Sequence, residues 1–276
     1  MKRIKISHVI VYFLAFLWAL ITFLPLLITF FSSFKNNAEV YLGTFQLPEI
    51  WRVSNYVDAV KIANALVSIG NSLLLSIAST AVVTCVGMLA SYALSRKSHL
   101  RFIRAAAAYF VIGVMVPIHC TIIPISSMAS KLSGKNSYVY LLMVYVAFNL
   151  AQAIFLYTGF LNGVSRELDE AAKIDGCNDI KLLLKILLPV SKPIIATEAI
   201  FVYIWAYGEL IFSLTLISDS SKFTVSRALL SFTGEHATAL GPKFAFIIMA
   251  VIPSLVMYML FRRHVEGGFM SGAIKG

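Results

Sequence analysis

The chain has 276 residues, of which 59% are hydrophobic and 13% are charged, and its mean hydropathy is +0.84. Soluble domains are about 45–50% apolar and about 25% charged, so this composition excludes an ordinary soluble domain and indicates a helical membrane protein with several spans. The net charge of +10 fits basic residues at the ends of spans rather than a nucleic-acid surface, because no basic stripe with interleaved aromatic residues lies outside the apolar stretches.

Six apolar stretches are long enough to cross a bilayer, which takes about 20 residues each. They are 8–31, 67–95, 103–127, 139–162, 194–217 and 244–262. The first is longer than the apolar core of a signal peptide and has no small-residue cleavage site after it. We therefore expect a single permease domain over 1–276, with six transmembrane helices and a retained first span.

The basic residues orient these spans, because lysine and arginine concentrate in cytoplasmic loops. With the N-terminus in the cytoplasm, most of the 23 lysines and arginines lie on that side, in the segments before span one, between spans two and three, between spans four and five, and after span six. Both termini are therefore predicted to be cytoplasmic. The two longer outer segments, 32–66 and 218–243, either carry aromatic residues that sit at the membrane interface or contact a partner on the outer face.

The inner segment 165–193 is rich in charge and predicts two short helices. Ser165 is a suitable N-cap for a helix from Glu167 to Ile174, and Asp175-Gly176 ends it, because glycine tolerates a left-handed turn. A second helix is expected from about Asn178, followed by Pro189 and Pro193. The expected buried stripe of the second helix is Ile180, Leu183, Leu184 and Leu187. By pattern alone, this segment either enters a groove of a partner or lies on the membrane surface.

The same segment carries a motif with fixed spacing. Glu170-Ala171-Ala172, Asp175-Gly176, Ile186 and Leu188-Pro189 match the EAA signature of ABC importer permeases without a gap, with Cys177 where the family often has alanine. The resemblance implies a type I ABC importer permease fold in which this loop is a coupling helix that docks into a separate ATPase. ATP-driven closure of that ATPase would then move the spans by a rigid-body rotation.

The C-terminus adds a second resemblance. Gly268, Gly272, Ala273, Lys275 and Gly276 match the Gly-rich tail of maltose-type carbohydrate permeases, and the chain resembles the smaller, six-span subunit of that subfamily. In that subfamily the tail, here 264–276, contacts the ATPase dimer. By composition alone a Gly-rich terminus is a frayed end. The segment ending at Arg96, and Pro117 and Pro124 around the third span, agree with the family pattern.

Acidic residues inside spans are candidates for function, because their burial in lipid is costly. Glu198 and Glu209 share one face of the fifth span. Glu198 is expected to reach the interface or to pair with Lys192. Glu209 follows Tyr207-Gly208 where the family often has Trp-Asn, so we favour an interhelical hydrogen bond over a direct solute contact. The candidate lining of a translocation path is His119, Asn149, Gln152, Tyr203 and Glu209, whose side chains equally suit hydrogen bonds between helices.

The chain lacks a phosphate-binding loop, a metalloprotease motif and a Cys/His cluster, so we expect no enzyme activity, no metal and no cofactor in this chain. The resemblance implies an ABC importer subunit for a sugar, with an oligosaccharide favoured, in a bacterial-type cell membrane. Its implied partners are a second homologous permease, two ATP-binding subunits that hold ATP and Mg, and an extracytoplasmic solute-binding protein. A permease for a glycerol-phosphate-type solute is the alternative. An ion-driven secondary transporter fits poorly, because both acids lie on one helix and no second half mirrors it.

Overall fold

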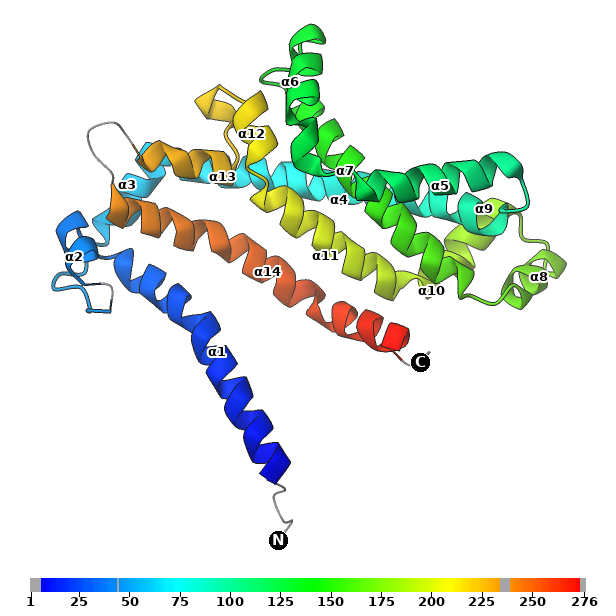
Figure 1. Cartoon of the computed structure of the whole chain (residues 1–276), viewed down its shortest axis with the longest axis horizontal. Coiled ribbons are helices and arrows are strands. Elements are labelled where there is room, and N and C mark those ends of the chain that lie inside the picture. The colour runs from blue at the N-terminus through cyan, green and yellow to red at the C-terminus, as the bar shows by residue number, and fades with distance from the viewer. Residues whose placement is uncertain (1–5, 44, 234–238, 274–276) are drawn as a thin grey trace. The chain divides into compact units, whose positions relative to one another are not determined.

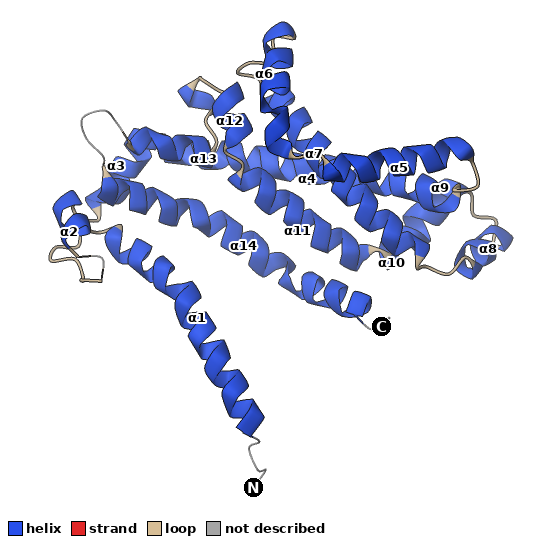
Figure 2. Cartoon of the chain, viewed as in Figure 1, coloured by secondary structure: helices blue, strands red, loops and turns tan. Residues whose placement is uncertain are grey.

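A computed structural model describes residues 6–43, 45–233 and 239–273, whose secondary-structure elements are helices (Figures 1 and 2). The long ones are α1 (Ile6–Ser32), α4 (Ala65–Arg96), α7 (Tyr138–Asn162) and α14 (Leu240–Ala273). Within the described residues, these four are long and apolar enough to cross a membrane, and two bent helix pairs raise the number of candidate spans to six. The predicted all-helical membrane fold is therefore confirmed, and the span count is between four and six.

Shorter helices connect or extend these four. They are α2 (Asn37–Leu42), α3 (Ser54–Ala63), α5 (Arg101–Met115), η1 (Ile118–Thr121), α6 (Ile122–Lys131), α8 (Glu167–Ile174), α9 (Asp179–Leu182), η2 (Leu183–Leu187), α10 (Leu188–Val190), α11 (Lys192–Gly208), α12 (Ile211–Leu216), η3 (Ser220–Lys222), α13 (Val225–Ala228) and η4 (Leu229–Phe232). The chain forms two compact units. One comprises 1–66 and 228–252, and the other comprises 67–227 and 253–276.

In the first unit, the segment after α1 is folded and is more than a linker. The Asn55 side-chain amide donates hydrogen bonds to the carbonyl oxygens of Ser33 and Lys35, at 2.8 and 2.9 Å. The ring of Trp51 lies 5.0 Å from that of Phe34, measured between ring centres. The predicted outer segment 32–66 therefore uses its polar and aromatic residues to hold its own turns together.

In the second unit, the core forms where α4, α7 and α11 meet. Gly87 of α4 allows a close approach to α7, since a Cβ atom added there would lie only 3.3 Å from the ring of Tyr157. The Ser91 hydroxyl donates a hydrogen bond across the same contact, to the carbonyl oxygen of Ile154 at 3.2 Å. Val202 of α11 packs into the same buried cluster as Tyr157. This core supports the segment that follows α7.

The third predicted span, 103–127, is not one straight helix. The axes of Arg101–Met115 and Ile118–Lys131 meet at 96°, and Figure 1 shows the sharp turn between α5 and α6. The break falls at Pro117, which has no N–H for the helix ladder and which disfavours helical geometry at Val116, where ψ is 120°. Pro124, by contrast, lies in the first turn of α6, where a missing N–H costs little.

The fifth predicted span, 194–217, is also interrupted. α11 ends at Gly208, and Glu209 has extended backbone with φ −64° and ψ 127° before α12 begins at Ile211. The chain also bends by 77° between Asp179–Val190 and Lys192–Gly208. Apolar composition alone cannot reveal these breaks, because the side chains on both sides of each break are equally hydrophobic.

Candidate functional site

The cytoplasmic segment predicted between the fourth and fifth spans folds as a helix-turn-helix. α8 spans Glu167–Ile174, as predicted, and the Ser165 hydroxyl accepts a hydrogen bond from the Glu167 N–H at 3.2 Å. Three acidic residues, Glu167, Asp169 and Glu170, lie in the first turn, where the helix dipole favours negative charge. The helix therefore starts where the sequence predicts, but the residue at the N-cap position is Arg166, without a side-chain capping bond, and the prediction that Ser165 is the N-cap is wrong by one position.

The turn after α8 has the hydrogen bonds of a Schellman motif. The Gly176 N–H donates to the carbonyl oxygen of Lys173 at 3.0 Å, and the Cys177 N–H donates to that of Ala172 at 2.9 Å. Gly176 has φ +75°, which glycine adopts without the strain that a Cβ atom adds. The Asn178 side chain then caps α9 by accepting from the Lys181 N–H at 2.9 Å. The glycine of the motif is thus required by the backbone of the turn.

The second helix differs from the predicted stripe. Leu183 and Leu187 are buried as expected, but Ile180 and Leu184 are exposed, and Leu182 is buried instead. A π-helical turn follows at Leu183–Leu187, and its extra residue places Leu182 and Leu187, five positions apart, on one face. Of the motif residues here, Ile186 and Leu188 are half-buried against this core, and Pro189 is exposed.

The two faces of α8 divide the EAA motif. Ala172 is 3% exposed and packs in the chain's own core, in the cluster that contains Tyr157 and Leu182. Glu170 and Ala171 are exposed, and so is Asp175 at the end of the helix. Of the two alanines that we expected to seat in a partner, only Ala171 is available on the surface. The exposed face of the loop therefore presents a carboxylate next to a methyl group.

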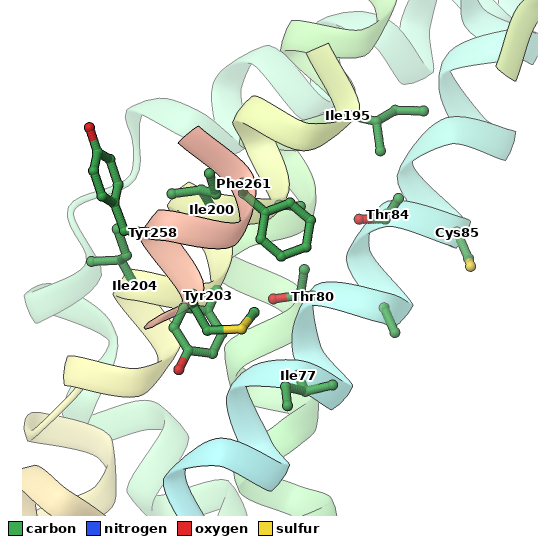
Figure 3. A pocket seen from close by; sticks show the side chains of 13 residues that line it. Ile77, Thr80, Thr84, Cys85, Ile195, Ile200, Tyr203, Ile204, Tyr258 and Phe261 are labelled. Carbon is green, nitrogen blue, oxygen red and sulfur yellow. The ribbon is translucent and has the colours of Figure 1, made fainter. Parts of the chain in front are cut away.

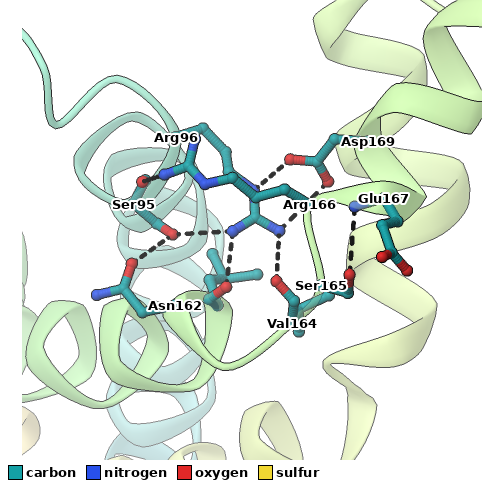
Figure 4. Close-up of polar contacts among 9 residues, drawn as sticks. Ser95, Arg96, Asn162, Val164, Ser165, Arg166, Glu167 and Asp169 are labelled. Atoms are coloured by element: carbon teal, nitrogen blue, oxygen red, sulfur yellow. Dashed lines mark hydrogen bonds and ion pairs between the residues drawn. The ribbon is translucent and has the colours of Figure 1, made fainter.

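The buried face of α8 is fastened by an ion pair. Arg96, the last residue of α4, places Nε 2.6 Å from Oδ2 of Asp169, and the side chains are 6% and 11% exposed. Its guanidinium also donates to the carbonyl oxygens of Leu161 and Val164, at 2.7 and 3.4 Å, at the end of α7 (Figure 4). A cation at this end of a helix also complements the helix dipole. One side chain thereby joins α4, α7 and α8.

A second arginine makes the reciprocal contact. Arg166, just before α8, donates to the carbonyl oxygen of Ser95 at 3.1 Å, and the Ser95 hydroxyl donates to Asn162 of α7 at 2.7 Å (Figure 4). We call these five residues, Ser95, Arg96, Asn162, Arg166 and Asp169, the clasp. The C-terminal end of α4 thus accepts a hydrogen bond from Arg166, and the C-terminal end of α7 accepts one from Arg96. The clasp therefore has an arginine bond running each way between the end of α4 and the segment from α7 to α8.

A more exposed ion pair lies beside the clasp. Lys97 Nζ is 3.2 Å from Oδ2 of Asp179 on α9, and both side chains are about half exposed. The hydrogen bond from Lys97 holds the pKa of Asp179 below its usual range, and the Tyr92 hydroxyl adds to this effect. Exposed ion pairs of this kind contribute little free energy, typically about 0–1 kcal/mol. The buried Arg96–Asp169 pair is therefore the stronger connection between α4 and the loop.

The candidate path residues do not share one cavity. His119 and Glu209 line a pocket of about 520 Å³ between η1 and the α11–α12 break. Asn149 donates to the Tyr145 carbonyl oxygen in its own helix, at 2.8 Å. Gln152 meets Glu198, with its Nε2 3.5 Å from Oε2. Because the side chain of Glu198 is fully buried, the prediction that it reaches the interface or pairs with Lys192 is wrong.

Glu209 makes the interhelical hydrogen bond that we favoured. Its Oε2 accepts from the Tyr145 hydroxyl of α7 at 2.9 Å and from the Ser213 N–H at 3.1 Å. Its Oε1 accepts from the Phe212 N–H at 2.7 Å. The carboxylate therefore satisfies free N–H groups at the start of α12 while tying α12 to α7.

Tyr203 lies elsewhere, in a pocket of about 300 Å³ formed by α4, α11 and residues 257, 258 and 261 of α14 (Figure 3). Its ring stacks on Tyr207 at 5.7 Å between centres. The pocket is almost entirely apolar, with Thr80 and Thr84 among its few polar side chains. Such a lining offers too few hydrogen bonds for a polar solute such as a sugar.

The C-terminal motif lies at the end of the described chain. α14 continues as a helix through Gly268, Gly272 and Ala273. Lys275 and Gly276 lie outside the described residues. The helical backbone of the tail is thus defined up to Ala273, and its contact with an ATPase stays a prediction.

Sequence reasoning missed the clasp. Arg96 was noted as a basic residue at the end of a segment that agrees with the family pattern, and Asp169 was not singled out. The available signal was spacing, because Asp169 stands three residues before Ala172 and hence on the inner face of α8. A carboxylate on a buried helix face requires a partner, and only the tertiary fold identifies Arg96.

Comparisons with known proteins agree with this architecture. Residues 83–269 match the family described as "Binding-protein-dependent transport system inner membrane component". A putative ABC transporter permease from a Caldicellulosiruptor species is 32% identical and covers 94% of both chains. The multiple sugar-binding transport system permease protein MsmG of Streptococcus mutans is 29% identical and covers 99% of both.

A solved structure supports the fold. It is that of a bacterial ABC transporter involved in the import of the acidic polysaccharide alginate, and the likeness has a TM-score of 0.80 at 21% identity, over 96% of this chain and 98% of that one. The motif at Glu170 lies inside the matched family region. The chain therefore belongs to the family of binding-protein-dependent transport system inner membrane components.

Proposed function

We propose that this chain is the permease subunit of an ATP-driven importer for a sugar, with α8 as the helix that docks into a separate ATPase. The observation that carries the proposal is the division of α8 into two faces. Glu170 and Ala171 are exposed, while Asp169 and Ala172 are held against the ends of α4 and α7. A helix that packs against this chain on one face and is exposed on the other can transmit a displacement of a bound partner to the membrane helices.

The charge of the free face defines what kind of partner surface fits it. Glu167 and Glu170 are exposed acids on the first turns of α8, and Ile174 is 86% exposed at its end. A complementary groove would offer a basic side chain near Glu170 and an apolar floor for Ile174. ATP and Mg would be held by that ATPase, which leaves this chain without a bound cofactor.

The proposed substrate is an oligosaccharide, delivered by an extracytoplasmic solute-binding protein. The Streptococcus mutans relative is named for multiple sugar-binding transport, and its similarity extends over nearly the whole chain. A glycerol-phosphate-type solute remains the alternative. We further propose that this chain pairs with a second homologous permease, that two ATP-binding subunits complete the assembly, and that both termini face the cytoplasm of a bacterial cell.

The proposal is tested by reconstituting the full assembly in proteoliposomes with labelled oligosaccharide and binding protein. Glu170→Arg places a positive charge where the proposed groove is basic, so ATP-dependent uptake should be abolished while the variant still inserts. The variant should also lose the ATPase on co-purification. A matched control is Lys181→Glu, which reverses an exposed charge on the neighbouring helix.

Two results would contradict the proposed function or its substrate. Uptake that follows an ion gradient with the ATPase absent would contradict the proposed function. Uptake of a glycerol phosphate and not of any oligosaccharide would keep the importer and overturn the sugar assignment. Deletion of 268–276 tests the tail in the same assay, since loss of transport with the subunits assembled is expected if it makes a second contact with the ATPase.

A further inference from the structure

The clasp stands out among the polar clusters of the described residues, because its central ion pair, Arg96–Asp169, has side chains that are only 6% and 11% exposed, whereas Asn162 and Arg166 at its edge are exposed. Arg96 makes contacts to the side chain of Asp169, to the Ser95 hydroxyl and to two backbone carbonyl oxygens of the α7 end. The carboxylate and the guanidinium are both nearly inaccessible to solvent. Most of both groups is therefore occupied by contacts inside this chain, although both line a small pocket beside Glu170.

We propose that Arg96 and Asp169 are positioning residues for coupling, which make α8 and the cytoplasmic ends of α4 and α7 move as one body. The proposal rests on the proposed function, since coupling requires a docked ATPase. A displacement of α8 is then transmitted to α4 and α7 through the side-chain contacts of the clasp, in addition to its transmission along the backbone into α11.

The chain path by itself would transmit movement poorly. Between α8 and α11 lie the turn at Gly176, the π-helical turn at Leu183–Leu187 and a bend of 77°. Each of these is a place where backbone geometry changes, and π-helical turns are less regular than α-helix. A rigid cross-connection at the start of the loop avoids all three.

The chemistry of the clasp suits a rigid connection. An arginine fork fixes two acceptors in one plane, and here one fork serves a carboxylate and two carbonyl oxygens at once. Because the pair is buried, solvent screens it little, and loss of one partner leaves the other charge unpaired. The half-exposed Lys97–Asp179 pair joins the same α4 end to α9 without these properties.

This contrast supplies a matched experiment on the complete transporter in proteoliposomes. Asp169→Asn removes the charge and keeps the shape of the side chain, and Asp179→Asn makes the same change in the exposed pair. Solute uptake and phosphate release are measured together. We expect the solute moved per ATP hydrolysed to fall about tenfold in Asp169→Asn and less than about twofold in Asp179→Asn, within the range of known coupling effects.

A distance measurement separates positioning from simple loss of stability. Spin labels at His99, after α4, and Lys173, on α8, are placed in a chain whose three cysteines are replaced by alanine. A narrow distance distribution is expected with Asp169 present, and a broad one in Asp169→Asn at equal assembly and equal thermal stability. Arg96→Lys, which keeps the charge but has no fork, should give an intermediate width and an intermediate ratio. If Asp169→Asn does not assemble, Arg96→Lys is used in its place for both measurements.

The outcomes are distinguishable. If the unmodified transporter couples uptake to ATP and both clasp variants retain that ratio and that distance distribution, the clasp proposal is overturned and the proposed function stands. Equal losses in Asp169→Asn and Asp179→Asn would also overturn it, because burial would then play no part. If the unmodified transporter shows no ATP-dependent uptake, the proposed function fails and this inference fails with it.

Discussion

The turn at Gly176 allows the loop geometry to be tested by one substitution series. Gly176 has φ +75°, and a Cβ atom added there would meet nothing within 4 Å. Gly159, inside α7, likewise has nothing within 4 Å of an added Cβ. The two sites therefore offer the same open space and differ in backbone conformation, so any difference between their alanine variants reports conformation alone.

The expected changes in stability have opposite signs at the two glycines. Alanine in the left-handed region costs about 1–2 kcal/mol, whereas alanine in place of glycine inside a helix stabilises by about 0.5–1 kcal/mol. Gly176→Ala should therefore open the turn, and the Cys177 amide, bonded to the Ala172 carbonyl oxygen at 2.9 Å, should exchange about 5–30 times faster. Gly176→Asn should have a smaller effect, because asparagine tolerates this conformation.

Hydrogen exchange of the segment from α8 to α9 in detergent or nanodiscs measures the effect. The order of exchange rates should be Gly176→Ala, then Gly176→Asn, then the unmodified chain. Gly159→Ala serves as the control and should leave this segment unchanged. If Gly176→Ala exchanges as slowly as the unmodified chain, then the turn does not require a residue that readily adopts positive φ.

Two further substitutions test the core and the break in the fifth span. Ala172→Leu should destabilise the chain by about 1–3 kcal/mol through overpacking and lower its melting temperature. Ala171→Leu should fold normally and weaken only the co-purification of the ATPase. Equal melting temperatures of the two variants would contradict the assigned faces of α8. Glu209→Gln should lose at least one of three accepted hydrogen bonds and about 1–3 kcal/mol of stability, with Tyr145→Phe less severe. Unchanged stability with weakened solute uptake would instead give Glu209 a direct role in transport.

Local sequence signals were sufficient to predict where the first helix of segment 165–193 begins and ends and where the second begins. The bounds Glu167–Ile174, the end at Gly176 and the Asn178 cap all depend on hydrogen bonds within a few residues, and the residue types that can make them are few. Composition likewise determined the membrane class, because six long apolar stretches have no other stable environment. Such features are encoded in consecutive residues.

Hydropathy does not reveal the two breaks, because a uniform apolar stretch gives the same hydropathy whether straight or bent. The break at Pro117 has a local cause in proline, whereas Glu209 also accepts a hydrogen bond from Tyr145 of α7, a contact that only the tertiary structure supplies. Packing against Tyr157 and Ala172 likewise decided that Leu182 is buried and Ile180 is exposed. The clasp joins residues 73 positions apart. Nothing local pairs Arg96 with Asp169, and only the folded chain brings the two charges together.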